Sequence, residues 1–163
     1  MADDVPRVYW DTNVLLSYIN GVDDRVPVIE ELFRKARAGE IELITSAVTR
    51  VEVAFAEGEK DAQALDPAVL ASIDTLWAPG SPLKTVEFFD LIGDGARDLM
   101  RRSISQGWGS LKPLDSIHLA TAQQMNAAEF HTYCQRLHRW SDKLGFPVIE
   151  PHTPQGLLGV GAA

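Results

Sequence analysis

The sequence is poor in cysteine: Cys134 is the only one among 163 residues. A single cysteine cannot form a disulfide bond within the chain, so a disulfide-stabilised scaffold is excluded. No basic segment followed by an apolar stretch opens the sequence, so nothing in it resembles a secretion signal. We therefore expect a cytoplasmic protein whose stability comes from a hydrophobic core.

Long apolar runs, internal repeats and low-complexity tracts are also missing. No run approaches the roughly 18 residues that span a membrane, so we expect no membrane segment. With 45% hydrophobic residues, the chain is long enough for one domain with a core and too short for two ordinary ones. We expect a single domain over residues 1–150 and a loose tail over 151–163, where proline and glycine replace periodic patterns.

Basic side chains are scarce relative to acidic ones. The chain has 15 lysines and arginines against 23 aspartates and glutamates, a net charge of −8. This balance excludes a simple polycation that holds nucleic acid by bulk attraction. Residues 1–82 carry 7 basic and 15 acidic side chains, whereas residues 83–163 carry 8 of each. If the protein meets a polyanion, we expect the second half to make the contact.

Short strand-like runs alternate with segments of helical periodicity from residue 7 to residue 149. The patterns predict strands over residues 7–10, 41–45, 84–89, 129–132 and 146–149. They predict helices over residues 14–19, from about 24 to Gly39, and over 49–56, 67–77, 93–106, 114–126 and 135–144. Because parallel strands need crossover helices, this order predicts an α/β fold with a parallel sheet covered on both faces. In such sheets the functional crevice lies beyond the carboxyl ends of the strands.

Three acidic residues stand where this arrangement makes acids unfavourable. Asp11 ends an apolar strand, Glu52 lies in an apolar helical turn, and Asp115 opens a helix rich in isoleucine, leucine and alanine. Buried carboxylates are normally paired with cations, hydrogen-bonded or bound to metal. A cluster of all three would suit Mg²⁺ or Mn²⁺, which prefer oxygen ligands. Such an ion supports phosphodiester hydrolysis by activating water and polarising the phosphoryl group.

Each acid taken alone also has an ordinary structural explanation. Asp115 would be a favourable charge at a helix N-terminus. Glu52 would pair with Arg50 or another basic side chain, and Asp11 would begin a turn with Asn13. The joint positions of the three acids in one alternating pattern favour the cluster.

Three segments, residues 8–16, 45–53 and 114–122, resemble the PIN-domain family in content and order. The resemblance implies a three-layer α/β/α fold with a parallel sheet of about five strands and an acidic Mg²⁺ or Mn²⁺ site that cleaves RNA. In the family pattern, metal-coordinating acids stand at the positions of Asp11, Glu52 and Asp115, and supporting polar residues at those of Thr12, Asn13 and Ser46. Small one-domain members resemble the VapC-like toxins, which implies an endoribonuclease with an antitoxin partner and a homodimeric state.

One position departs from the family pattern. A fourth acid commonly follows the strand after the third motif, but the sequence here reads Thr132-Tyr133-Cys134. A thiolate is a soft ligand for Mg²⁺, so we expect a weak or empty second metal position. The alternatives are a nuclease using one ion, or an RNA- or protein-binding module with weakened or lost activity. A third, an enzyme with Asp11 as nucleophile, lacks the second aspartate that a haloacid-type phosphatase would place at Asn13.

Further polar and basic residues are candidates for the same site. Ser116, His118 and Thr132 either reach the site or are simply packed and hydrogen-bonded within the fold. Trp108, between two glycines, either stacks on a base or packs under its loop. Six basic residues either carry an RNA backbone or form a solvated face: Arg97, Arg101, Arg102, Lys112, Arg136 and Arg139.

Overall fold

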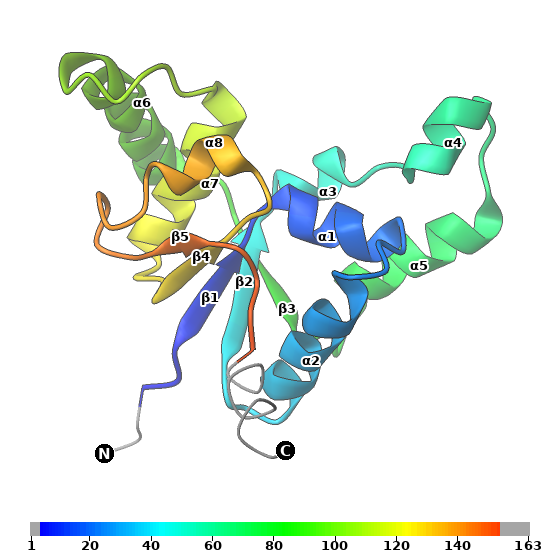
Figure 1. Ribbon diagram of the computed structural model, residues 1–163. Helices are drawn as coiled ribbons and strands as arrows, with labels where there is room; N and C mark the ends of the chain where they lie inside the picture. The colour runs from blue at the N-terminus through cyan, green and yellow to red at the C-terminus, as the bar shows by residue number, and fades with distance from the viewer. Residues whose placement is uncertain (1–3, 154–163) are drawn as a thin grey trace.

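The computed structural model describes residues 4–153, and its centre is a parallel sheet (Figure 1). The described residues form the strands β1 (Arg7–Trp10), β2 (Glu42–Ser46), β3 (Leu83–Val86), β4 (Glu129–His131) and β5 (Val148–Ile149). Their order is β3-β2-β1-β4-β5, and every neighbouring pair is parallel. The five-stranded parallel sheet expected from the sequence is confirmed.

Helices cover both faces of this sheet. Within residues 4–153 they are α1 (Thr12–Ile19), α2 (Val26–Arg37), α3 (Thr49–Glu52), α4 (Glu57–Ala62), α5 (Pro67–Trp77), α6 (Asp90–Ser105), α7 (Pro113–Gln124) and α8 (Gln135–His138). Figure 1 shows α6, α7 and α8 on one side of the sheet and α1, α2 and α5 on the other. None of these helices is both long and apolar enough to cross a membrane.

Two hydrophobic cores result from the alternation of side chains along the strands. On β1, Tyr9 is buried against α6 and α7, whereas Val8 and Trp10 are buried against α1 and α2. Both faces of the strand are therefore apolar, as is typical of parallel sheets covered on both sides. This confirms the three-layer α/β/α architecture.

Helix α5 follows its sequence signals closely. The Asp66 side chain caps the helix by accepting from the backbone N–H of Ala68, and Pro67 occupies the first helical position. The helix ends at Trp77, as predicted. The cap, the proline and the apolar spacing all predict the same bounds, so local signals are sufficient to predict this helix.

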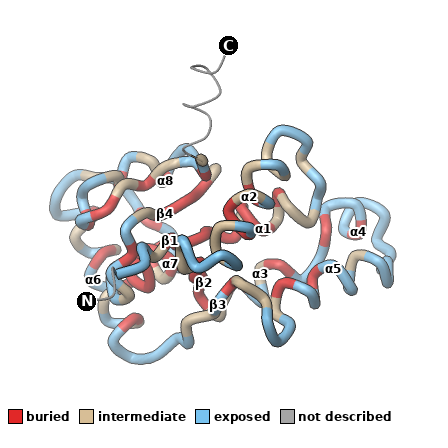
Figure 2. Tube along the Cα trace, turned by 90° about the horizontal axis from the view of Figure 1, so that it is seen from below, coloured by how far each residue is buried: buried red, intermediate tan, exposed pale blue. Residues whose placement is uncertain are grey.

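The helix predicted over residues 49–56 is wrong. The structure has the single turn α3, then a break, and then α4, which the patterns did not predict. Val51 is 79% exposed, whereas Val53 is fully buried. Burial of Val53 requires a non-helical backbone there, with φ −100° and ψ 47°. Tertiary packing thus overrides helical periodicity. Figure 2 shows α4 at the periphery and largely exposed.

Other boundaries differ more modestly. Helix α6 begins at Asp90 rather than at Gly93, and β3 ends at Val86 rather than at Phe89. Helix α8 has only four residues, and turns replace the rest of the predicted helix, with Asp142 at a positive φ of 64°. Of the tail expected over 151–163, residues 154–163 lie outside the described part, whereas Pro151 is buried.

Candidate functional site

Asp11 lies directly after β1 and caps α1 with its side chain. Its Oδ1 accepts from the backbone N–H of Thr12 at 2.8 Å. Its Oδ2 accepts from Asn13 Nδ2 at 3.0 Å and from Thr132 Oγ1 at 2.8 Å. The residue is 4% exposed, so these three donors compensate a buried charge. Because an ionised carboxylate offers about four lone-pair positions, Asp11 is fixed in orientation with one position to spare.

Glu52, the last residue of α3, is held by the side chains of two other segments. Its Oε1 accepts from Thr12 Oγ1 at 3.0 Å and contacts His118 Nε2 at 2.7 Å. Burial raises the pKa of Glu52, but the hydrogen bond and charge of His118 lower it more, so its pKa lies below the ordinary value. Its Oε2 accepts no hydrogen bond from residues 4–153. Glu52 is therefore an ionised side chain with one free oxygen.

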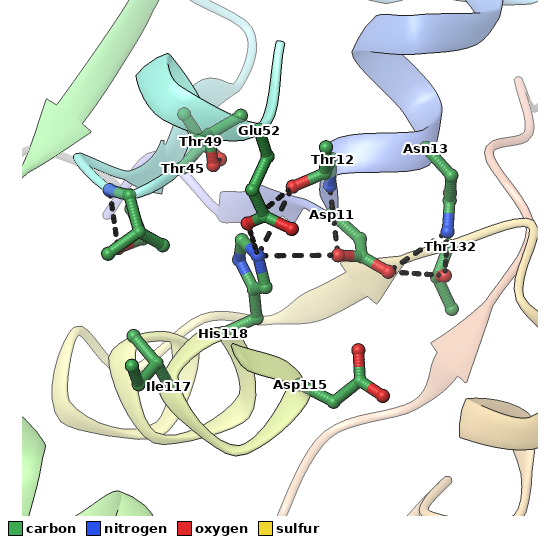
Figure 3. Close-up of polar contacts among 12 residues, drawn as sticks. Asp11, Thr12, Asn13, Thr45, Thr49, Glu52, Asp115, Ile117, His118 and Thr132 are labelled. Carbon is green, nitrogen blue, oxygen red and sulfur yellow. Dashed lines mark hydrogen bonds and ion pairs between the residues drawn. The ribbon is translucent and has the colours of Figure 1, made fainter. Parts of the chain in front are cut away.

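His118 stands between Asp11 and Glu52 (Figure 3). Its Nε2 lies 2.7 Å from Glu52 Oε1 and 3.7 Å from Asp11 Oδ1, and the residue is 1% exposed. Burial lowers the pKa of His118, but the hydrogen bond to Glu52 and the charge of Asp11 raise it more, leaving its pKa above the ordinary value. Of the two explanations open in the sequence, the structure supports contact with the acidic residues.

Tyr9 and Ser46 position the other side of the His118 ring. The Tyr9 hydroxyl lies 2.6 Å from His118 Nδ1 and accepts from the backbone N–H of Ser46 at 3.0 Å. Burial raises the pKa of Tyr9 well above its ordinary value, so the hydroxyl keeps its proton. The ring is thus held by the Tyr9 hydroxyl at Nδ1 and by Glu52 at Nε2. No sequence signal indicates this role of Tyr9, because an aromatic residue on a buried strand is usually part of the core.

Asp115 projects from the first turn of α7 on the side where Asp11 lies (Figure 3). No hydrogen bond from residues 4–153 reaches its carboxylate, and its ion pair is with Arg136 Nη2 at 3.5 Å. Burial raises the pKa of Asp115, the charge of Asp11 raises it further, and Arg136 and His118 offset only part of this. Asp11 and Asp115 thus repel each other, and the nearby cations offset only part of this repulsion.

The three predicted acids surround one site without forming a tight triad. Their ligand oxygens do not all lie within 4.8 Å of one another, because the His118 ring separates Asp11 from Glu52. The donor set nevertheless fits a hard divalent cation: one position on Asp11, the Oε2 of Glu52 and both oxygens of Asp115 are free of hydrogen bonds from the described residues.

The predicted supporting residues fall into two groups. Asn13 and Thr132 bind Asp11, and Asn13 Oδ1 also accepts from the backbone N–H of Tyr133 at 2.8 Å. Ser116 does not take part, because its hydroxyl donates to the Pro113 carbonyl of its own helix at 2.6 Å. For Ser116 the ordinary structural explanation is therefore the correct one.

Cys134 is half-buried at the N-terminus of α8, where the family pattern expects an acid. Its backbone N–H donates to Thr132 Oγ1 at 3.0 Å. Arg136, two residues further along α8, has its Nη2 3.5 Å from Asp115 Oδ2. A cation therefore stands beside Asp115 on this side of the site.

The six basic candidates differ in what they contact. Lys112 and Arg136 flank Asp115, and both lower its pKa. Arg139 instead donates to the Ser110 carbonyl at 2.6 Å, and Arg102 pairs with Asp98 at 3.7 Å. The remaining two, Arg97 and Arg101, are exposed on α6.

Trp108 packs under its loop. Its ring meets the buried Trp140 edge to face, with centroids 5.3 Å apart, and packs against the core beside α6 and α7. Arg102 and Lys143 lie over the same ring, at 5.6 and 5.8 Å from its centroid. The structure thus favours packing over a platform for base stacking.

Comparisons with known proteins agree with this architecture. The model of the PIN domain family matches residues 8–142. Three similar solved structures are DNA-bound VapBC from Salmonella typhimurium (16% identity, TM-score 0.61), VapBC2 from Rickettsia felis bound to a promoter DNA fragment (14%, 0.59) and FitAcB from Neisseria gonorrhoeae (14%, 0.58). The matches cover 89%, 88% and 88% of this chain and 97% of each of those chains. No curated protein matches the chain in sequence. With most of its length matched by the family model, the chain belongs to the PIN domain family.

Proposed function

We propose that the protein is a Mg²⁺- or Mn²⁺-dependent endoribonuclease and the toxin of a toxin/antitoxin pair. The observation that carries the proposal is the pairing of Asp11 and Asp115 at the carboxyl edge of the sheet. Asp11 is fixed by three donors, whereas no described residue donates a hydrogen bond to Asp115. A buried and a half-buried carboxylate left in this state favour binding of a divalent cation.

The chain's own residues have distinct roles in this proposal. Asp11 and Asp115 hold the ion, and Asn13 and Thr132 fix the direction of Asp11. A bound Mg²⁺ or Mn²⁺ would polarise the scissile phosphate and increase the acidity of a water. Glu52, ionised and with Oε2 free, is suited to orient that water by accepting a hydrogen bond from it.

Lys112 and Arg136 support RNA as the substrate. Both lie close enough to Asp115 to lower its pKa, and both are exposed. They would bind backbone phosphates on either side of the scissile bond. These are local cations in an otherwise acidic protein, so contact with a polyanion would be confined to this site.

Partners and domain limits are part of the same proposal. The similar structures include complexes described as VapBC and, from Klebsiella pneumoniae, as a toxin-antitoxin complex. We propose an antitoxin partner and a homodimer, in which apolar side chains at α3 to α5 are covered. Val51, Leu65 and Leu70 are 79%, 78% and 56% exposed there.

We propose that residues 1–150 form one domain.

The proposal is tested by replacing the two central acids. Asp11→Asn and Asp115→Asn keep the size of the side chain, and each should lower Mn²⁺-dependent RNA cleavage by at least about a hundredfold while circular dichroism stays unchanged. Asp94→Asn, on the exposed side of α6, is the matched control and should cleave like the wild type. Undiminished cleavage by Asp11→Asn would refute the proposed ligand set.

A binding module with a weakened site is the second candidate, and the position of Cys134 favours it. Cys134 replaces an acid, and Arg136 adds a positive charge beside Asp115. Cys134→Asp separates the two candidates. A large gain in metal affinity and cleavage from near zero supports the weakened module, and little change in an active enzyme supports a one-ion nuclease.

A further inference from the structure

A second group of ligating side chains lies on the opposite face of the sheet from Tyr9 and α7. Glu129 and His131 are two residues apart on β4, so their side chains share one face. They are in register with Val8 and Trp10, which are buried against α1 and α2. His152, three residues beyond β5, joins them from the following segment.

The three side chains already converge. Glu129 Oε2 lies 2.7 Å from His131 Nε2 and 3.1 Å from His152 Nε2. Within residues 4–153, this is the one group of three histidine, cysteine or acidic residues whose ligand atoms all lie within 4.8 Å of one another. Ligands about 2.1 Å from a tetrahedral zinc ion are about 3.4 Å apart, so small side-chain shifts suffice to admit an ion.

The His131 ring is 1% exposed and presents its Nε2 to the cluster. Its Nδ1, the other ring nitrogen, has no hydrogen-bond partner among the described residues. Nε2 is therefore the nitrogen that an ion in the cluster would meet. Beside the cluster is a small pocket of about 130 Å³, lined by apolar residues such as Leu32 and Ile41 and by Lys35.

We propose that Glu129, His131 and His152 bind a transition-metal ion, most suitably Zn²⁺, at a site separate from the acidic one. Two imidazoles and a carboxylate are ligands typical of zinc and poorly matched to Mg²⁺. The Asp11 site, with oxygen ligands, has the opposite preference. The two sites thus select different ions.

An ion held here would connect two parts of the chain at an edge of the sheet. Glu129 and His131 belong to β4, whereas His152 follows β5, which has only two residues. The metal would fasten the segment after β5 to β4 and so stabilise the weakly anchored edge strand. His152 is 49% exposed at its side chain, which leaves the fourth position open to water on that side.

Zinc binding to the untagged full-length protein in excess Mg²⁺ tests this site. Competition with a chromophoric chelator should give one Zn²⁺ per chain, and Co²⁺ should give the visible absorption of a tetrahedral complex. His152→Ala and Glu129→Gln should each weaken binding by at least about tenfold and abolish that absorption. The side chains of Glu129 and His152 are partly exposed, so both variants should fold. Saturating Zn²⁺ should raise the Tm of the wild type but not that of His152→Ala.

Two controls separate this site from the proposed nuclease site. Asp11→Asn, which removes an acidic-site ligand, should keep its Zn²⁺ affinity. His138→Ala, a histidine outside the cluster that contacts the Thr132 carbonyl, should also bind normally. Loss of zinc binding in Asp11→Asn with retention in His152→Ala would overturn the assignment, as would a wild type that binds no Zn²⁺ in excess Mg²⁺.

Discussion

His118 is the residue that organises the acidic site. It contacts Glu52 and Thr12 through Nε2 and Tyr9 through Nδ1, so one buried ring links β1, α1, α3 and α7. Its position three residues after Asp115 places it one helical turn further along α7. The three acids therefore do not form a direct triad: Asp11 and Asp115 form a pair, and Glu52 is held beside them through His118. The geometry of Glu52 depends on this ring.

Tyr9→Phe should destabilise the protein by about 1 to 3 kcal/mol. The substitution leaves the buried Ser46 N–H without its acceptor and His118 Nδ1 without its hydrogen-bond partner, and unsatisfied buried groups carry costs of this size. Urea denaturation followed by circular dichroism measures the change. Tyr18→Phe is the control, since the Tyr18 hydroxyl makes no hydrogen bond within residues 4–153. Equal stability of the two variants would contradict the proposed role of the Tyr9 hydroxyl.

Sequence reasoning located the residues of the site that sit at strand ends. Asp11, Asn13 and Thr132 come together because parallel strands β1 and β4 end at the same edge, and a strand pattern predicts that edge. It could not choose between the roles of His118 and Ser116, which differ by only two positions on α7. That choice depends on which way the helix faces, and α7 is largely buried around its circumference, so it has no polar face to orient it.

At the scale of elements, a helix predicted from the sequence is correct where the local signals and the packing agree. The cap and proline of α5 predict its bounds, whereas α3 and α4 replace one predicted helix because Val53 turns into the core.

The strands β1 to β3 are also joined at their amino ends by side chains. Glu42 accepts from Arg7 Nε at 2.8 Å and from Lys84 Nζ at 3.1 Å, and so spans three strands.

Glu42→Gln should destabilise the sheet at neutral pH and do so less in acid. The hydrogen bond from Arg7 holds the pKa of Glu42 below its ordinary value. A lowered folded-state pKa contributes stability above the unfolded-state pKa, and this is lost as pH falls through the folded-state pKa. Because Arg7 and Lys84 are partly exposed, we expect a loss of about 1 kcal/mol or less at pH 7. Urea unfolding of both proteins at pH 7 and below pH 4 measures it; a difference that does not shrink in acid would contradict the ion-pair explanation.

At the scale of the whole molecule, the net charge of −8 opposes the approach of RNA. Asp11, Glu52 and Asp115 place three of the negative charges at the proposed site, and one divalent ion would reduce their sum from −3 to −1. The first half of the chain holds most of the acidic excess, whereas Lys112 and Arg136 come from the balanced second half. If the proposed function is correct, phosphate binding therefore depends on the metal and on a few local cations.

Lys112→Gln should weaken RNA binding and make it less sensitive to salt. Each phosphate contact releases counterions, so loss of one contact lowers the slope of log K against log salt by about 1. Fluorescence anisotropy with a labelled RNA in Mn²⁺, measured in a Glu52→Gln background to slow cleavage, gives that slope. Lys35→Gln, which removes an equal charge from α2 on the other side of the sheet, should keep the wild-type slope. Equal slopes for Lys112→Gln and Lys35→Gln would mean that bulk charge, and not a cation beside Asp115, governs contact with the RNA backbone.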